Sequence, residues 1–447
     1  MEVKKYGELL KRHSVLFENF TYISILQIFV ILAPLLTYPY LVRVLGSDLY
    51  GWVITAQIVA SYGSILVDFG FKSVSAKHVS IHRENKAKLS EIVSSILTIR
   101  FFLWLCSLIV YMGIIRFIPL YREHFWLFFF SFGITFNELL FPQFYFQGME
   151  RMKYITILNI IIRSVFVVLT FFCIRKAEDY ILVPLLLAIG YFIGGMIALY
   201  IIFFHDRLSY RLPSRSDMLY YFKDAAPIFC TDVICTIKDK LNYILLGAWV
   251  GVENVVVYDL GSRFTNIILK PAGIVATVLF PKIAKERNVI LFRKITIALF
   301  CGIIVLVVLL NLFLPQIVVF FMAEKIDLLP IRLYSLVPLI VGISGYIASN
   351  LMIALGYNKY ILYSILVTTT IYLFLLGGMY WGGRMNSVIS FVWLTFLSYL
   401  GELIYRLIIG LKIIKNETDR KSKGSKVWSD FMKPVENLIF RLSGINP

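Results

Sequence analysis

Long apolar segments separated by short polar ones dominate the pattern of this chain. About 20 consecutive apolar residues form a helix long enough to cross a bilayer. Twelve such segments occur, and each predicts a membrane-spanning helix. They lie at residues 19–42, 50–71, 92–115, 124–147, 154–174, 181–204, 225–250, 254–280, 295–320, 331–356, 360–380 and 387–411. The pattern therefore predicts an all-α integral membrane protein.

Composition and charge support this fold class. The chain of 447 residues is 59% hydrophobic and 16% charged, whereas soluble proteins are about 45–50% apolar and about 25% charged. Of its 44 Lys and Arg residues, 29 lie in the termini and loops on one side of the predicted spans, and seven lie on the other side. Because basic loops stay inside, we expect both termini to be cytoplasmic. This distribution also argues against nucleic acid as a partner of the +17 chain.

Two of the predicted spans carry a polar stripe at the same spacing. The eighth span has Asp259, Arg263, Asn266 and Lys270 at i, i+4, i+7 and i+11, which is one helix face. The second span repeats this spacing with Gln57, Ser61, Ser64 and Asp68. A charge inside a bilayer costs about 2.5–3.5 kcal/mol, so such residues face a water-filled cavity or a partner. The stripe predicts a hydrophilic pathway, and the alternative is a buried salt-bridge seam that fixes packing.

The repeated stripe also indicates two halves of six spans each. We predict an N-terminal six-helix bundle at residues 1–210, a C-terminal one at 211–411 and a basic cytoplasmic tail at 412–447. In the tail, residues 427–442 have apolar side chains at helical spacing, which is typical of an amphipathic helix on a membrane surface. Two pseudo-symmetric halves are typical of transporters that bind their substrate between them.

Basic residues exceed acidic ones inside the spans, by eight to six. A cavity lined this way favours an anionic substrate such as a phosphate-bearing lipid head group. If spans seven and eight fold as a hairpin about Gly251, Asp232 lies level with Lys270 and Asp239 with Arg263, which allows two ion pairs. Three further sets of charges inside the spans have separate interpretations. They are Glu402 and Arg406, expected as a structural pair; Arg100 and Glu138, expected to pair with each other or with Arg163; and Asp68, expected to be solvated.

The sequence disfavours enzymatic chemistry. His78 and His82 have the i, i+4 spacing of metal ligands, but a closed site needs about four ligands and a third is lacking nearby. The predicted loops are too short to hold the catalytic site of a membrane-embedded glycosyltransferase or polymerase. We expect neither a metal nor a cofactor.

Several local motifs carry a family resemblance. The segment 33–51 (APLLTYPYLVRVLGSDLYG) is followed by Asp68-Phe69-Gly70 and a basic segment, and the second half has Leu246-Gly247, Tyr258 and Leu279-Phe280-Pro281. These features resemble the Wzx-type O-antigen and polysaccharide repeat-unit flippases. The resemblance implies two six-helix bundles around a central cavity in the bacterial inner membrane. It also implies export of undecaprenyl-pyrophosphate-linked oligosaccharide during lipopolysaccharide or capsule synthesis.

Together these observations predict a lipid-linked oligosaccharide flippase that works by alternating access, with a cation-coupled multidrug exporter of the same superfamily as the alternative. Four bases are expected to bind the substrate: Arg163, Lys240, Arg263 and Lys270. Asp232 and Asp239 are expected to couple transport to an ion. Membrane lipid and the lipid-linked substrate are the expected partners, with a polysaccharide polymerase as a further candidate.

Overall fold

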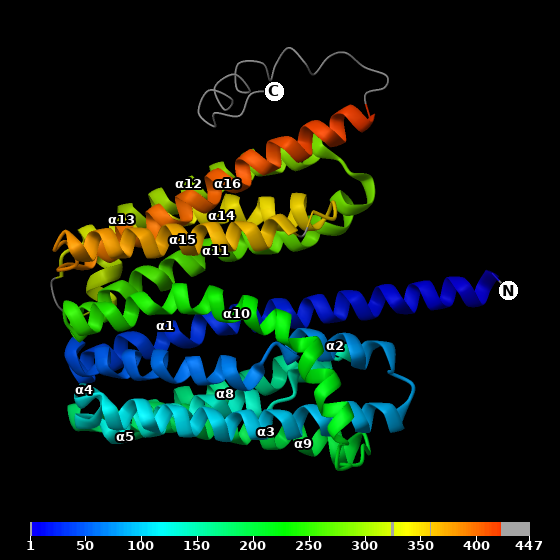
Figure 1. Cartoon of the computed structure of the whole chain (residues 1–447), viewed down its shortest axis with the longest axis horizontal. Helices are drawn as coiled ribbons and strands as arrows, with labels where there is room; N and C mark the ends of the chain where they lie inside the picture. Colours follow the sequence, from blue (N-terminus) through cyan, green and yellow to red (C-terminus); the bar gives the residue numbers. More distant parts are fainter. Residues whose placement is uncertain (1, 323–325, 358, 422–447) are drawn as a thin grey trace. The chain divides into compact units, whose positions relative to one another are not determined.

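The structure of the protein, a computed structural model, describes residues 2–322, 326–357 and 359–421. Every regular element among them is a helix (Figure 1). In chain order they are α1 (Glu2–Asp68), α2 (Phe71–Ile81), α3 (Lys86–Phe117), α4 (Pro119–Glu123), α5 (Phe125–Ser131), η1 (Phe132–Thr135), α6 (Phe136–Leu140), α7 (Gln143–Gly148), α8 (Met152–Cys173), η2 (Ala177–Ile181), α9 (Leu182–Tyr200), η3 (Ile201–His205), α10 (Arg215–Trp249), α11 (Val252–Glu286), α12 (Val289–Met322), α13 (Leu329–Tyr334), α14 (Val337–Ile347), η4 (Ala348–Ile353), α15 (Lys359–Trp381) and α16 (Val388–Lys421). The predicted amphipathic helix at 427–442 lies outside the described residues.

The long element α1 consists of two arms that meet at Gly46. The backbone of Gly46 has φ 78° and ψ 163°, a conformation that glycine adopts without the steric cost that a Cβ would add. The chain reverses there, and the rings of Tyr38 and Tyr50 on the two arms meet edge to face at 5.1 Å. The arms correspond to the predicted spans 19–42 and 50–71.

Ten helical segments of the described chain are long and apolar enough to cross a membrane. This count takes the two arms of α1 as one segment, Thr21–Ile81, and leaves out α10. Helix α10 covers the predicted seventh span, but it carries Asp232, Lys238, Asp239 and Lys240 within that span. With the arms counted separately and α10 included, the helices match the twelve predicted spans.

One predicted loop is instead mostly helical. Residues 72–91 connect the predicted spans 50–71 and 92–115 on the basic, cytoplasmic side. They lie largely in α2 and the first turns of α3. Val74 and Val79 are buried against the core of the surrounding helices, so these apolar positions hold the segment as a helix. His78, considered above as a metal ligand, contacts Asp224 of α10 at 2.8 Å through its Nε2 atom.

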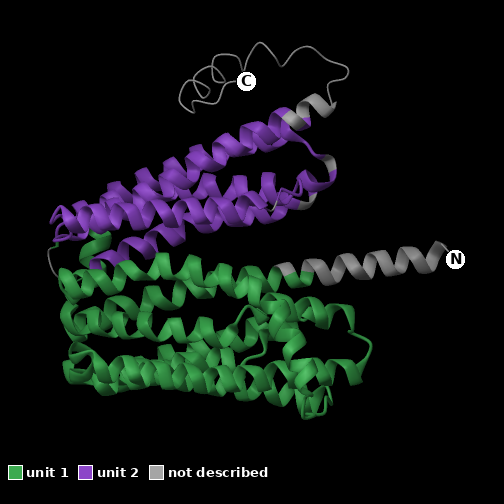
Figure 2. Ribbon diagram, viewed as in Figure 1, with its two compact units in different colours: residues 1–256, 316–326 green, residues 257–315, 327–447 purple. Residues whose placement is uncertain are grey.

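The chain forms two compact units (Figure 2). Unit 1 comprises Met1–Val256 and Gln316–Ile326, and unit 2 comprises Val257–Pro315 and Asp327–Pro447. In unit 1, the guanidinium of Arg43 donates to the carbonyl of Phe320 at 2.7 Å, which ties the end of α12 to α1. The predicted division into 1–210, 211–411 and 412–447 stays a prediction.

Each unit has its own buried core. Unit 1 is packed around aromatic and β-branched side chains of α2, α3, α7 and α8, among them Phe71, Ile92, Ile96, Phe144 and Phe146. Unit 2 is packed around side chains of α11, α12, α14, η4 and α16, among them Ile283, Phe292, Tyr346, Leu351 and Ile413. Glycines let the membrane helices approach closely: a Cβ on Gly190 of α9 would lie 2.7 Å from the carbonyl oxygen of Ile162 in α8.

A buried carboxylate fixes the end of the α9–η3 segment. Asp206 accepts hydrogen bonds from Arg151 Nη1 at 2.7 Å and from the Tyr145 hydroxyl at 2.7 Å. His205 contacts the same carboxylate at 3.0 Å. Burial acts to raise the pKa of Asp206, but these hydrogen bonds outweigh it and hold the pKa below its ordinary value. The group is therefore a charged anchor at neutral pH.

Candidate functional site

Some polar side chains of the stripe on α11, in unit 2, form hydrogen bonds to other residues of the same helix. Arg263 Nε donates to Asp259 Oδ2 at 2.6 Å, and the amide of Asn266 donates to the Ser262 carbonyl at 3.0 Å. Lys270 follows on the same face and is half-buried. Arg263 therefore has a carboxylate partner one turn away, which reduces its availability to an anionic substrate.

The second polar stripe, on the second arm of α1, contacts α10 inside unit 1. Lys240 Nζ donates to Ser61 Oγ at 2.5 Å. Ser64 and the neighbouring Tyr62 also have buried hydroxyl oxygens without a hydrogen-bond partner among the described residues. The stripe thus contacts the charged part of α10 through Lys240, and the polar pathway stays a prediction.

The two predicted ion-coupling residues lie on α10 in different surroundings. Asp239 forms an ion pair with the adjacent Lys238 at 3.1 Å. Asp232 is exposed and forms no hydrogen bond or ion pair within the described chain, but it lies in electrostatic reach of Asp68. The ion pairs predicted across the Gly251 hairpin join residues of the two units and stay predictions.

Arg163 has different surroundings from Lys240, which donates to a hydroxyl, and from Arg263, which pairs with a carboxylate. It lies near the middle of α8 and is half-buried, and it makes no hydrogen bond or ion pair within residues 2–322, 326–357 and 359–421. Its neighbour Ile162 packs against Gly190 and Gly194 of α9, which fixes the helix orientation at this level. Tyr191 of α9 lies in electrostatic reach of Arg163 and of Glu138. An unpaired guanidinium inside a membrane helix is typical of a ligand-binding position.

Three charged residues of unit 1 that were not assigned to the site, Asp68, Arg100 and Glu138, are joined by contacts of the buried Arg100 guanidinium. Arg100 is 1% exposed; its guanidinium forms an ion pair with Asp68 and donates to the Glu138 carbonyl oxygen at 2.8 Å. Asp68, expected to be solvated, has an ion-pair partner in Arg100 and keeps 20% of its side chain exposed. Arg100 also reaches the Glu138 backbone rather than its carboxylate, which accepts from the Asn137 amide at 2.7 Å. Asp68, the last residue of the polar stripe on α1, was the sequence signal for this cluster.

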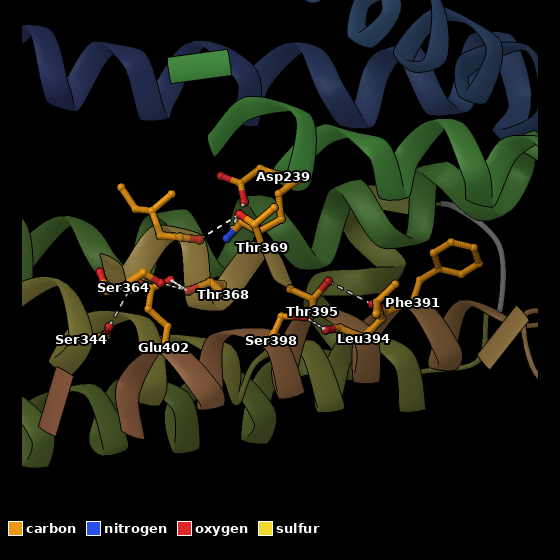
Figure 3. A network of polar contacts seen from close by, with 12 residues as sticks. Asp239, Ser344, Ser364, Thr368, Thr369, Phe391, Leu394, Thr395, Ser398 and Glu402 are labelled. Atoms are coloured by element: carbon orange, nitrogen blue, oxygen red, sulfur yellow. Dashed lines mark hydrogen bonds and ion pairs between the residues drawn. The ribbon is translucent and has the colours of Figure 1, made fainter. Parts of the chain in front are cut away.

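The predicted structural pair in α16 is part of a larger network in unit 2. Figure 3 shows one member of the pair, Glu402, beside Ser344, Ser364 and Thr368. Arg406 and Glu402 form an ion pair at 2.6 Å, and both are 7% exposed. Thr368 of α15 donates to Glu402 at 2.8 Å, while Arg406 donates to Ser364 of α15 and to Ser344 of α14, both at 3.0 Å. The network joins three helices, and the predicted pairing of Glu402 with Arg406 is confirmed.

The structure thus distributes the predicted site residues over both units. Unit 1 holds Arg163, Lys240, Asp232 and Asp239, and unit 2 holds Arg263 and Lys270. Within unit 1, α10 is the element that brings predicted residues next to α1. That all six residues line one cavity stays a prediction.

This fold, with charged positions inside its membrane helices, defines a multi-pass α-helical membrane protein. The family model described as "Polysaccharide biosynthesis protein" matches residues 16–287, more than half of the chain. The chain belongs to this family. The resemblance that the sequence motifs indicated is therefore confirmed.

Individual similar proteins agree with this assignment. The "Putative O-antigen transporter" of Escherichia coli (strain K12) is 23% identical over 282 residues, which cover 62% of this chain and 68% of that protein. The solved structure entitled "Lipid II flippase MurJ, inward closed conformation" matches with a TM-score of 0.69 at 16% identity, over 93% of this chain and 96% of that one. A multidrug resistance MATE family transporter in an inward-facing conformation matches with a TM-score of 0.63 at 14% identity, over 88% and 96% of the two chains. At these identities the structural matches establish the fold, and they confirm the predicted fold class.

Proposed function

We propose that this protein is a flippase that moves an undecaprenyl-pyrophosphate-linked oligosaccharide from the inner to the outer leaflet of the bacterial inner membrane by alternating access. Membership of the polysaccharide biosynthesis family supports the substrate class. The similarity to O-antigen transporters supports transport, so the proposal gives the protein no enzymatic role. Both termini are placed in the cytoplasm by the proposal, because the basic segments lie on that side.

The observation that carries the proposal is Arg163, which makes no hydrogen bond or ion pair with any residue that the structure describes. A guanidinium binds phosphate oxygens in a bidentate manner and stays protonated at all physiological pH values. Ion-paired bases in the same protein already have their charge neutralised, as Arg263 does by Asp259. The proposal assigns the pyrophosphate to Arg163 because of its charge, and it keeps Lys240, Arg263 and Lys270 as further substrate-binding bases.

The test follows lipid-linked oligosaccharide in cells that lack the chromosomal gene. Wild-type protein should restore its passage to the outer leaflet, whereas Arg163→Ala should lower the rate at least about tenfold, the consequence of losing about 1.4 kcal/mol of binding. Arg163→Lys should restore part of the rate because the charge returns without the bidentate geometry. Export is measured by the access of a membrane-impermeant glycosidase or lectin to the oligosaccharide.

Val168→Ala is a matched control, since this side chain lies on the same helix and is 51% exposed. Its export rate should equal that of the wild type at equal protein level. A normal leaflet distribution in the deletion strain, together with raised drug sensitivity, would refute the proposal in favour of a drug exporter.

A further inference from the structure

The segment that leads from η3 into α10, residues 207–215 and called here the strap, is held in place at its first residue. Arg207 has φ 57°, and positive φ is uncommon for a residue other than glycine. On one side of it, the carboxylate of Asp206 is the anchor described above, and Lys86 of α3 donates to the Asp206 carbonyl at 3.3 Å. On the other side, the backbone N–H of the buried Leu208 donates to the Ile202 carbonyl at 3.2 Å. The strap therefore starts from a fixed point beside α3.

Two buried serines of α3 then hold the strap along that helix. Residues 207–214 have no regular secondary structure, so their backbone N–H groups need partners outside the strap. Ser90 Oγ accepts a hydrogen bond from the N–H of Ser209 at 3.2 Å. One turn further along α3, Ser94 Oγ accepts from the N–H of Arg211 at 3.1 Å. The strap thus runs beside α3 in the direction of that helix.

The strap lies where α3 leaves the hydrocarbon core of the membrane. At a rise of 1.5 Å per residue, Arg116 in the last turn of α3 stands about 33 Å beyond Ser94. The core of a bilayer is about 30 Å thick, so these two positions match its two boundaries. The hydroxyl of Tyr210 lies 2.8 Å from Thr98 Oγ1, one turn of α3 beyond Ser94. Tyrosine is enriched at membrane–water interfaces, which agrees with a strap at the level of the lipid head groups.

Exposed side chains of the strap alternate between basic and apolar types. Leu212 is 88% exposed and Tyr210 is 52% exposed. They stand among Arg207, Arg211 and Arg215, which are all exposed. The guanidinium groups of these three arginines make no hydrogen bond or ion pair within the described part of the chain. Basic residues interleaved with exposed apolar ones are typical of segments that lie in a membrane surface.

The acidic residues at either end of the strap are engaged elsewhere. Asp206 binds Arg151 and Tyr145. Asp217, in the first turn of α10, accepts a hydrogen bond from the Ser214 hydroxyl at 2.6 Å. The strap arginines therefore present positive charge to their surroundings. Charge alone is enough to orient a membrane protein, but orientation requires neither a backbone held against α3 nor a leucine as exposed as Leu212.

We propose that the strap is a binding surface for anionic phospholipid of the membrane in which the protein lies. Its three arginines bind head-group phosphates, since a guanidinium pairs with phosphate oxygens in a bidentate manner. Tyr210 and Leu212 enter the glycerol and upper acyl region between them. Successive arginines are at most about 14 Å apart along an extended chain, so they bind neighbouring head groups rather than a single one. This surface goes beyond the proposed flippase function and does not depend on it.

The first experiment measures which lipid contacts the strap. A fluorescent label is placed at Leu212→Cys in full-length protein whose five native cysteines are replaced by serine. The protein is reconstituted in phosphatidylcholine nanodiscs with increasing fractions of brominated phosphatidylglycerol or brominated phosphatidylcholine, because bromine quenches a label that it contacts. Half-maximal quenching should occur at a phosphatidylglycerol fraction at least about tenfold lower than that of phosphatidylcholine. A label at Ile109→Cys, which is 72% exposed on α3, is the control and should respond equally to both lipids.

The second experiment tests the arginines. Arg207→Gln, Arg211→Gln and Arg215→Gln should each reduce the preference for phosphatidylglycerol by up to about fivefold, and the triple variant should abolish it. Arg122→Gln is the matched control, because it removes an exposed arginine of α4 outside the strap. It should leave the preference unchanged. With the strap arginines intact, raising NaCl from about 0.05 M to about 0.5 M should weaken the preference, since salt screens the attraction.

Three results would overturn the inference. A label at residue 212 that neither brominated lipid quenches would show that the strap lies outside the membrane. Equal quenching by the two lipids would show that the strap does not select anionic head groups. A preference that survives the triple variant would assign the lipid to another surface. None of these measurements uses oligosaccharide, so their failure is distinguishable from failure of the proposed flippase activity.

Discussion

Charged side chains inside the helices of the two units differ in how completely they are paired and hydrogen-bonded. In unit 2, Glu402 and Arg406 are one turn apart on one helix, and hydroxyls of two other helices satisfy them. In unit 1, Arg100 and Asp68 come from different helices, Arg100 Nε lacks a partner among the described residues, and Arg163 stands unpaired. A fully satisfied network rigidifies a core, whereas incompletely satisfied charges retain the capacity to bind a ligand or a proton. The comparison thus contrasts one buried ion pair of unit 2, whose groups all have partners, with charged groups of unit 1 that are incompletely partnered among the described residues.

Breaking the satisfied network should give the largest loss of stability. Arg406→Leu leaves Glu402 buried without its base, so we expect about 3–5 kcal/mol of destabilisation. Thermal unfolding in detergent, followed by far-ultraviolet circular dichroism, measures this loss. The double variant Glu402→Leu with Arg406→Leu should recover most of the stability because neither charge remains. Equal losses in the single and double variants would show that packing, and not charge, is what the network contributes.

Separating the helices that position Arg163 should have a smaller effect. Gly190→Ala brings a Cβ within 2.7 Å of the Ile162 carbonyl oxygen, so α8 and α9 must move apart, at about 1–3 kcal/mol. Export should fall with it, because Arg163 moves with α8. Gly113→Ala is the control, since its Cβ would meet nothing within 4 Å. A stable Gly190→Ala variant with normal export would show that this close approach is not needed.

The Asp206 anchor allows a pH test within unit 1. Its pKa is lower in the folded protein than in an unfolded chain, so its contribution is complete above the unfolded pKa of about 3.9 and is lost as pH falls through the folded value. Arg151→Ala should cost about 1 kcal/mol at neutral pH, a small value because Arg151 is partly exposed. The difference in unfolding free energy between wild type and variant should shrink below about pH 4. A difference that is constant over pH would contradict the charged role of this carboxylate.

The smallest effect on stability is expected at Arg163. Because it lacks a direct partner in the described chain, Arg163→Ala should change the free energy of unfolding by no more than about 0.5 kcal/mol, although export falls. This combination of unchanged stability and lost transport is the signature of an exchangeable charge. A large destabilisation would instead show that Arg163 has a structural role like that of the Glu402–Arg406 pair, and it would contradict the contrast drawn above.

Much of the fold could be predicted from the sequence because membrane helices are encoded locally. A span needs about 20 apolar residues wherever it packs, so segments such as 154–174 and 360–380 correspond closely to α8 and α15. The i, i+4 spacing of Glu402 and Arg406 likewise predicted their pair, since helix geometry alone brings them together. The sequence did not predict that residues 72–91 are mostly helical, because the segment is largely polar. Its apolar positions, such as Val79, are buried only by the tertiary core.

The sequence by itself determined the class of protein, the helices and which residues carry charge inside them. Only the tertiary structure decided which of these charges are paired. Asp68 and Arg100 are 32 residues apart along the chain, and their contact depends on how three-dimensional packing brings α1 beside α3. In the same packing, Lys240 donates a hydrogen bond to the Ser61 hydroxyl of α1. Arg163 has no direct partner among the described residues. Helical periodicity specifies the face on which a charge lies, but the partner across that face comes from a helix whose rotation and depth are set by side-chain packing.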